Sequence, residues 1–253
     1  MKVTVLQTDI RWNCPEANHA SALRLISENP NSDLYVLPEM WTTGFDISST
    51  HADGLQSNDD SLHWMKSIAM KNDCALCGSL SIKEGSTYRN RLYFVYPDGS
   101  VCHYDKRHLF SYAGEDKSYT PGAERVIARY RGFRLLLQIC YDLRFPVWMR
   151  NKDDYDAIIL VANWPSSRIG VWHILTRARA IENQCYVIAA NRTGQDPYCR
   201  YEGHSAVINA KGQTLVQAVG KGEQAITTEI NKDDLLRFRD KFPVLNDSDI
   251  FKI

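Results

Sequence analysis

The chain has 253 residues, and 44% of them are hydrophobic, which is enough to fill a sizeable core. Its 30 basic residues balance its 30 acidic residues, so charge favours neither a nucleic-acid partner nor an anionic membrane surface. No segment approaches the length of a membrane span, and the first apolar stretch is too short for a secretory signal. Seven cysteines at irregular spacing argue against a disulfide framework. We expect a cytoplasmic protein whose partner is a small molecule or another protein.

In the first half of the chain, short apolar strands alternate with helical segments. One helix opens at Pro15, since proline is favoured in a first helical turn, and a second opens near Asp59. Pro97-Asp98-Gly99 separates two β-rich runs and predicts a hairpin. A loop then runs from residue 106 to 122, and its length and its aromatic and charged content favour a functional role. Strands are expected at residues 3–8, 34–37, 74–82, 92–96 and 101–104.

The second half repeats this plan. A helix is expected at 171–184, a hairpin turns at 210–212, and a short amphipathic helix follows Asp233. Strands are expected at residues 135–139, 156–161, 186–190, 205–209 and 213–216. No linker separates the halves, so we predict a single domain over residues 1–253 with a short tail from about residue 240. Layer rules then predict an α/β fold, a four-layer α-β-β-α sandwich of two mixed sheets with helices outside.

Cys140 ends the apolar run of residues 135–139 and is followed at once by charged residues. A free cysteine at a strand end is more often part of the core than a nucleophile. Here, however, the run leads into a sharp turn and then into Phe145-Pro146, where proline can open a helix. This arrangement resembles the elbow that exposes a nucleophile at a sheet edge, and a helix start makes a thiol more acidic. Cys140 is therefore a candidate nucleophile.

Two charged residues stand at the ends of other predicted strands. Glu39 follows the apolar run of residues 34–37 and Pro38, and Lys106 follows the strand at 101–104. Each could be an ordinary solvated charge. In layered α/β folds, however, the strand ends on one side form the usual site, so the three reactive side chains could meet.

The sequence around these residues resembles a known family. "LPEMWTTGF" with Glu39, "YDKRHLF" with Lys106 and "QICYDLRFP" with Cys140 are similar to the Glu-Lys-Cys motifs of the nitrilase superfamily of carbon–nitrogen hydrolases. The resemblance runs from Met1 to about Ile230 and includes "VANWP", "RARAIENQCYV" and "GHSAVINAKG". Within the family the chain is most similar to the omega-amidase branch, which hydrolyses the terminal amide of 2-oxo-dicarboxylic acid monoamides. This implies a nitrilase-like sandwich, an amide substrate, and no cofactor or metal.

The resemblance also implies a mechanism with a cysteine thioester. Glu39 takes the proton of Cys140, and the thiolate attacks the amide carbon. Lys106 and the backbone N–H of Tyr141 stabilise the oxyanion. The family places a second glutamate in the long loop, which matches Glu115, and this residue orients Lys106 or the substrate amide.

An omega-amidase substrate carries a carboxylate, so a cation should lie at the far end of the pocket. Arg144 is the first choice and Arg168 the second, although either could form an ordinary ion pair instead. Four further side chains could wall the pocket or pack in the core: Trp41, Phe45, Asn163 and Trp164.

Several alternatives remain open. His108 could form a Cys-His dyad with Cys140, whereas the family resemblance makes it a supporting residue. Cys74 and Cys77 have redox-motif spacing but lie within a predicted strand, which favours plain packing. The substrate could be another amide or an N-carbamoyl amino acid, or the chain could be a non-catalytic binding protein or thiol sensor. The resemblance alone implies a homodimer formed through the helix at 171–184.

Overall fold

The computed structural model describes residues 1–47 and 56–249, and it contains two six-stranded sheets packed face to face. The first sheet has the order β14 (Gln224–Glu229), β1 (Lys2–Gln7), β2 (Leu34–Val36), β3 (Ala75–Glu84), β4 (Thr87–Val95) and β5 (Val101–Asp105). The second has the order β13 (Thr214–Gln217), β12 (Ala206–Ile208), β9 (Tyr186–Asn191), β8 (Ala157–Ala162), β7 (Phe133–Ile139) and β6 (Ile127–Tyr130).

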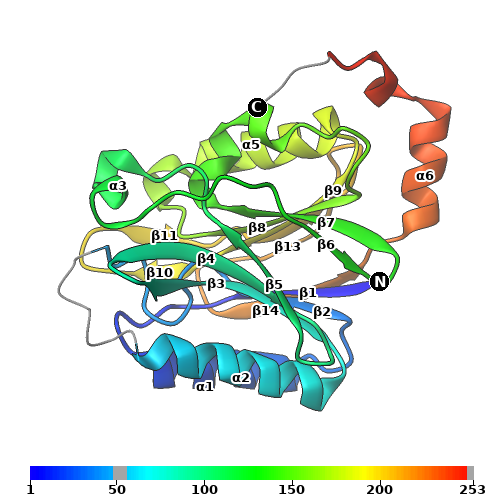
Figure 1. Cartoon of the computed structure of the whole chain (residues 1–253). Helices are drawn as coiled ribbons and strands as arrows, with labels where there is room; N and C mark the ends of the chain where they lie inside the picture. Colours follow the sequence, from blue (N-terminus) through cyan, green and yellow to red (C-terminus); the bar gives the residue numbers. More distant parts are fainter. Residues whose placement is uncertain (48–55, 250–253) are drawn as a thin grey trace.

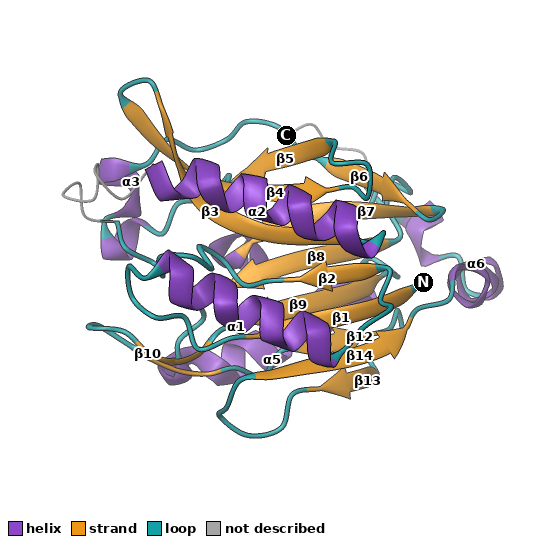
Figure 2. Cartoon of the chain, turned by 90° about the horizontal axis from the view of Figure 1, so that it is seen from below, coloured by secondary structure: helices purple, strands orange, loops and turns teal. Residues whose placement is uncertain are grey.

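Helices cover the outer faces of both sheets. Figure 1 shows α1 (Pro15–Glu28) and α2 (Gln56–Asn72) below the first sheet and α5 (Ile169–Glu182) above the second. Seen from below, α1 and α2 lie side by side across the first sheet (Figure 2). At the side of the sandwich stands α6 (Lys232–Lys241), followed by the short helix η5 (Val244–Asp247). The predicted fold class, a four-layer α-β-β-α sandwich, is confirmed.

Strand alternation explains the layers. In β1, Val3 and Val5 point into the core between the sheets, whereas Leu6 faces the helices. In the next strand, Val36 joins the inner core and Tyr35 the outer one. A β-strand side chain can face only one of two directions, so both faces of the sheet must be apolar when both are covered.

Both sheets are mixed, and each has parallel strands at its centre. In the first sheet β2 is parallel to β1 and β3, and in the second β8 is parallel to β7 and β9. Strands β4, β5 and β6 are antiparallel to their neighbours. Parallel strands end at the same edge of a sheet, and this edge carries the candidate residues.

Most predicted elements have their expected positions, but β4 begins at Thr87 rather than at residue 92, and strands β6 and β14 were not predicted. The helix expected near Asp59 begins at Gln56, and the loop at 106–122 contains the short helices η2 (Ser111–Ala113) and α3 (Glu115–Ser118). Across residues 1–47 and 56–249, none of the helices is both long and apolar enough for a membrane crossing. A single domain with a tail from about residue 240 stays a prediction.

Candidate active site

The turn after β7 presents Cys140 at the sheet edge. Cys140 opens the short helix η3 (Cys140–Arg144) with a φ of 44°, in the left-handed region that non-glycine residues rarely adopt. The buried carboxylate of Asp142 holds this turn, because its Oδ2 accepts the backbone N–H of Ile139 at 3.0 Å and the Tyr104 hydroxyl at 2.8 Å. A strained residue held by its surroundings is typical of a functional site.

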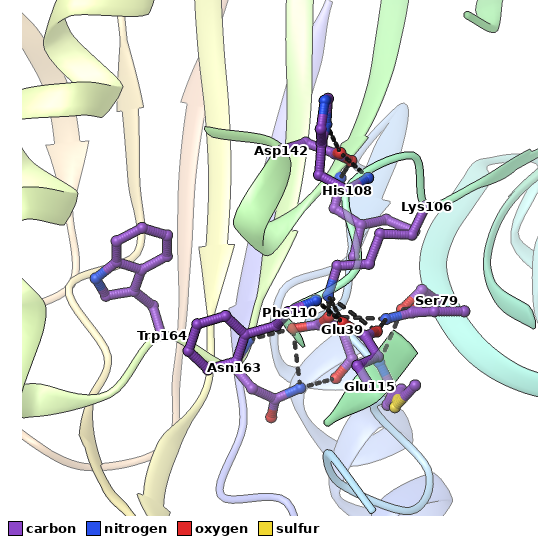
Figure 3. A network of polar contacts seen from close by, with 12 residues as sticks. Glu39, Ser79, Lys106, His108, Phe110, Glu115, Asp142, Asn163 and Trp164 are labelled. Atoms are coloured by element: carbon purple, nitrogen blue, oxygen red, sulfur yellow. Dashed lines mark hydrogen bonds and ion pairs between the residues drawn. The ribbon is translucent and has the colours of Figure 1, made fainter. Parts of the chain in front are cut away.

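His108 supports the same turn. The other oxygen of Asp142 accepts the backbone N–H of His108 at 3.0 Å and lies 2.8 Å from its ring Nδ1. The His108 ring also stacks on Phe145, with a centroid distance of 3.7 Å. These contacts occupy His108 with Asp142 rather than with Cys140, so the geometry favours the supporting role over a Cys-His dyad (Figure 3).

Glu39, Lys106 and Glu115 form a cluster that solvent does not reach. The Lys106 ammonium lies 2.9 Å from Oε1 of Glu39 and 2.9 Å from Oε2 of Glu115, and all three side chains are 0% exposed. Glu39 follows β2, Lys106 follows β5 and Glu115 begins α3, so the cluster joins three segments. Figure 3 shows these side chains converging from separate elements.

Backbone and amide donors complete this cluster. The backbone N–H of Asn163 donates to Oε2 of Glu39 at 2.8 Å, and its side-chain amide donates to the Glu39 carbonyl at 2.7 Å. The backbone N–H of Phe110 donates to Oε2 of Glu115 at 2.6 Å. Buried carboxylates require such donors to remain ionised.

The charges of the cluster set the protonation of the thiol and the carboxylate. Burial acts to raise the pKa of Glu39, but the Lys106 ammonium lowers it below its ordinary value. Burial and the Glu39 charge raise the pKa of Cys140 well above that of a free thiol, although Lys106 opposes them. The Cys140 thiol and the Glu39 carboxylate lie close enough for each to influence the pKa of the other. The resting site therefore pairs a neutral thiol with an ionised carboxylate, which can act as its base.

A cavity of about 480 Å³ opens in front of this cluster. Glu115 contacts Lys106 from behind and does not line the cavity. Tyr141 lines it directly after Cys140, and the N–H groups in a first helical turn have no partner within the helix. Of the predicted site residues, these line the cavity: Glu39, Phe45, Lys106, Cys140, Tyr141, Arg144, Asn163, Trp164 and Arg168.

Two arginines in the cavity wall lie over aromatic rings. The Arg144 guanidinium is 5.2 Å from the centre of the Trp164 ring, and that of Arg168 is 5.3 Å from the centre of the Phe110 ring. Neither side chain has a hydrogen bond or ion pair to any residue in the described part of the chain. Their N–H donors are therefore available to an anion in the cavity.

Comparisons with known proteins agree with this geometry. The family model for carbon-nitrogen hydrolase matches residues 2–240. This chain belongs to the carbon–nitrogen hydrolase family. It is 41% identical to the omega-amidase YafV of Escherichia coli strain K12, over 100% of this chain and 98% of that protein. It is 33% identical to the 2-oxoglutaramate amidase of Bacillus subtilis strain 168, over 97% of this chain and 96% of that protein. The crystal structure of XC1258 from Xanthomonas campestris, a CN-hydrolase superfamily protein, has a TM-score of 0.94 at 37% identity, over 100% of this chain and 98% of that one.

The carbon–nitrogen hydrolase has cavity residues that the sequence reasoning missed. The hairpin of β10 (Thr193–Gln195) and β11 (Arg200–Glu202) closes one side of the cavity. At its tip the buried carboxylate of Asp196 accepts the backbone N–H groups of Tyr198 and Cys199 and the Tyr201 hydroxyl. The pair Asp196-Pro197 favours a turn and could have predicted this hairpin from the sequence. The remaining missed residues are Asp46, Ile47, Phe110, Tyr112, Ala113 and Pro165.

Trp41 was left open between a pocket wall and core packing. It is 1% exposed and packs beneath the first sheet with His19 and Trp64, so the structure favours the core alternative. The chain makes a sharp turn after Glu39, where Met40 has a φ of 41°, and this turn directs the next side chain to the opposite face. The Cys74 and Cys77 thiols are buried and form no disulfide. Cys74 directly precedes β3 and Cys77 lies within it, which agrees with the interpretation that they pack in the core.

Proposed function

We propose that this hydrolase is an omega-amidase, which converts 2-oxo-dicarboxylic acid monoamides such as 2-oxoglutaramate and 2-oxosuccinamate into the acid and ammonia. The observation that carries the proposal is the convergence of Cys140, Glu39 and Lys106 on one cavity, which also holds two arginines that have no ion-pair partner among the described residues. A thiol with a buried base fits amide hydrolysis, and the arginines fit a substrate that carries a carboxylate. The names of the relatives from Escherichia coli and Bacillus subtilis support the same substrate class.

The first half of the reaction acylates Cys140. Glu39 accepts the thiol proton, and the sulfur attacks the carbon of the terminal amide. The negative charge on the amide oxygen is stabilised by the Lys106 ammonium and the N–H of Tyr141. When the tetrahedral intermediate collapses, the carbon–nitrogen bond breaks, and the proton held by Glu39 moves to the departing nitrogen. Ammonia leaves, and the acyl group remains on Cys140 as a thioester.

The second half returns the enzyme to its resting state. Glu39 takes a proton from a water molecule, and the resulting hydroxide attacks the thioester carbon. The carbon–sulfur bond breaks, and the sulfur recovers its proton from Glu39. Throughout the cycle Glu115 does not meet the substrate, because it lies behind Lys106, where it keeps the ammonium charged and oriented.

We further propose that Arg144 and Arg168 bind the substrate carboxylate. Replacing either arginine with methionine is expected to raise KM for 2-oxoglutaramate about 10- to 100-fold, since a hydrogen bond to a charged group contributes about 1.5–3 kcal/mol. Lysine at either position should restore only part of the loss, because it cannot donate two parallel hydrogen bonds. The kinetics of butyramide, which has no carboxylate, serve as the matched control. An equal loss on both amides would remove the carboxylate-binding role.

A substrate panel tests the proposed function. Ammonia release by the purified wild-type chain is measured with 2-oxoglutaramate, an N-carbamoyl amino acid, a simple aliphatic amide and a nitrile. We expect kcat/KM for the oxo acid amide to exceed the others by at least about a hundredfold, which corresponds to about 2.7 kcal/mol of transition-state binding. A similar value for an unrelated amide would leave amide hydrolysis intact and remove the omega-amidase proposal.

We also propose that the enzyme is a cytoplasmic homodimer that forms through α5. None of the seven cysteines forms a disulfide in the described structure, which suits a reducing compartment. Ile174 and Ile181 lie two turns apart on α5 and are 68% and 53% exposed, so they form an apolar strip suited to a second copy. Changing both to glutamate should produce monomers in sedimentation velocity experiments. Leu236→Glu, at an exposed position on α6, is the matched control and should leave the dimer intact.

A further inference from the structure

Asn90 lies at the centre of the buried cluster, although it does not line the cavity. It sits in β4 and is 1% exposed. Its Nδ2 lies 2.8 Å from Oε1 of Glu39 and 3.2 Å from Oε1 of Glu115. An amide nitrogen carries two hydrogens, so each carboxylate can receive one.

Two hydrogen bonds through Ser79 fix the orientation of this amide. Ser79 Oγ accepts the backbone N–H of Met40 at 2.9 Å, so its own hydrogen is free to donate to Oδ1 of Asn90, also at 2.9 Å. A flipped amide would place its oxygen against two carboxylates and its nitrogen against the Ser79 hydroxyl. The hydrogen-bonded chain therefore runs from the backbone of Met40 through Ser79 and Asn90 to the side chain of Glu39.

The two carboxylate oxygens of Glu39 differ in how many of their acceptor sites are occupied. Each carboxylate oxygen has two lone pairs in the plane of the group. On Oε1 both are used, by Lys106 at 2.9 Å and by Asn90 at 2.8 Å. On Oε2 the backbone N–H of Asn163 uses one at 2.8 Å. The amide of Asn163 lies farther from Oε2, at 3.4 Å, and makes its shorter bond to the Glu39 carbonyl.

We propose that Asn90 is a positioning residue, which occupies Oε1 of Glu39 and so directs the Cys140 proton to Oε2. This inference rests on the proposed acyl-transfer mechanism and deepens it. The proton then moves between Cys140 and one defined atom during acylation, and from that atom to the leaving nitrogen. Without Asn90, Oε1 regains a lone pair and competes for the proton in an unproductive position.

Asn90 also affects the charge balance of the site. Among the described residues, the titratable and charged groups that face Glu39 are Lys106 directly after β5, Glu115 from α3 and Cys140 from η3. Two carboxylates face one ammonium, and the Asn90 amide supplies a neutral donor to both of them. Removing a donor from an ionised carboxylate raises its pKa. Loss of Asn90 should therefore make Glu39 easier to protonate.

Asn90→Leu tests the proposal, since it keeps the approximate shape and removes both donors. We expect kcat to fall about 10- to 100-fold, which is typical for a misplaced acid–base group, while KM changes less than about twofold. The acid limb of the pH–rate profile should move up by about one pH unit, the equivalent of one hydrogen bond to a charged group. Ser79→Ala frees the Asn90 amide to turn. It should lower kcat and raise the acid limb in the same way as Asn90→Leu, but by a smaller amount.

The control is another buried asparagine. Asn151 is 1% exposed, and its amide donates to the carbonyl groups of Tyr155 and Asn183, which lie outside the cavity. Asn151→Ala should lower the unfolding midpoint without moving the acid limb. An Asn90→Leu enzyme with an unmoved acid limb, or with a raised KM and normal kcat, would overturn the proposal.

The experiment separates this inference from the proposed substrate. The profiles are measured with whichever amide the wild-type chain hydrolyses best, so a different substrate does not affect the test. The rate of Cys140 alkylation by iodoacetamide, followed by peptide mass spectrometry, gives a second pH profile that needs no substrate. Its acid limb should move in the same direction in Asn90→Leu, and an unchanged alkylation profile would contradict the role of Asn90.

Discussion

Replacing Cys140 with alanine is expected to lower kcat for amide hydrolysis by a factor on the order of 10⁴ or more, as for the loss of other catalytic nucleophiles. Cys140 is the thiol that lines the cavity together with Glu39, and without it the proposed base has no thiol to activate for acylation. The turn itself should persist, because Asp142 holds it through Ile139 and Tyr104 and not through the sulfur. Substrate should therefore still bind, which isothermal titration calorimetry can measure.

A matched thiol in the same cavity provides the control. Cys199 also lines the cavity, but its place on the β10–β11 hairpin keeps it among Asp196 and Tyr201 rather than beside Glu39. Cys199→Ala should keep kcat within a few-fold of the wild type. Intact-mass spectrometry during turnover should detect an acyl adduct in the wild type and in Cys199→Ala, and none in Cys140→Ala. Full retention of ligand response with no adduct in any protein would instead support the thiol sensor.

Strand ends explain why so much of this site could be predicted from the sequence. Cys140 directly follows an apolar run, and Glu39 follows one after Pro38, so each marks where a buried strand reaches an edge of its sheet. Lys106 directly follows β5, a more polar strand that ends at the same side. Layer rules then bring such ends together. The same reasoning could not predict the conformation at Cys140, because its φ of 44° depends on contacts from Asp142 to a distant strand.

The position of the Asn90 side chain could not be predicted from a single sequence. It lies between two arginines in the middle of β4, and an isolated polar residue in a strand is equally compatible with either face. Only the register of β3 and β4, which pairs Asn90 with Ser81 and sets it near Ser79, places its amide between the two glutamates. The sequence left Trp41 open between pocket and core for a related reason, since the turn at Met40 places neighbours in sequence on opposite sides of the sheet.

The second large effect is expected for Lys106→Met. This change leaves the carboxylates of Glu39 and Glu115 buried and without their shared cation, and breaking a buried ion pair in this way costs about 3–5 kcal/mol of folding stability. It also removes the proposed side-chain donor for the oxyanion, so kcat should fall by roughly 10²- to 10³-fold. Urea unfolding at pH 7 measures the first effect, and ammonia release the second. An unchanged unfolding midpoint would mean that Lys106 does not balance these charges.

The pH dependence of this variant distinguishes charge balance from simple loss of packing. In the wild type the folded state holds the pKa of Glu39 below its ordinary value, so this carboxylate stabilises the fold above its unfolded pKa, and that stability is lost as pH falls. Without Lys106, burial and mutual repulsion should raise the pKa of both glutamates, and the folded variant should then gain stability relative to the wild type as pH falls through these raised values. Lys106→Met combined with Glu115→Gln removes one of the two charges. It should recover part of the stability at pH 7 without recovering activity, because the oxyanion donor is still missing.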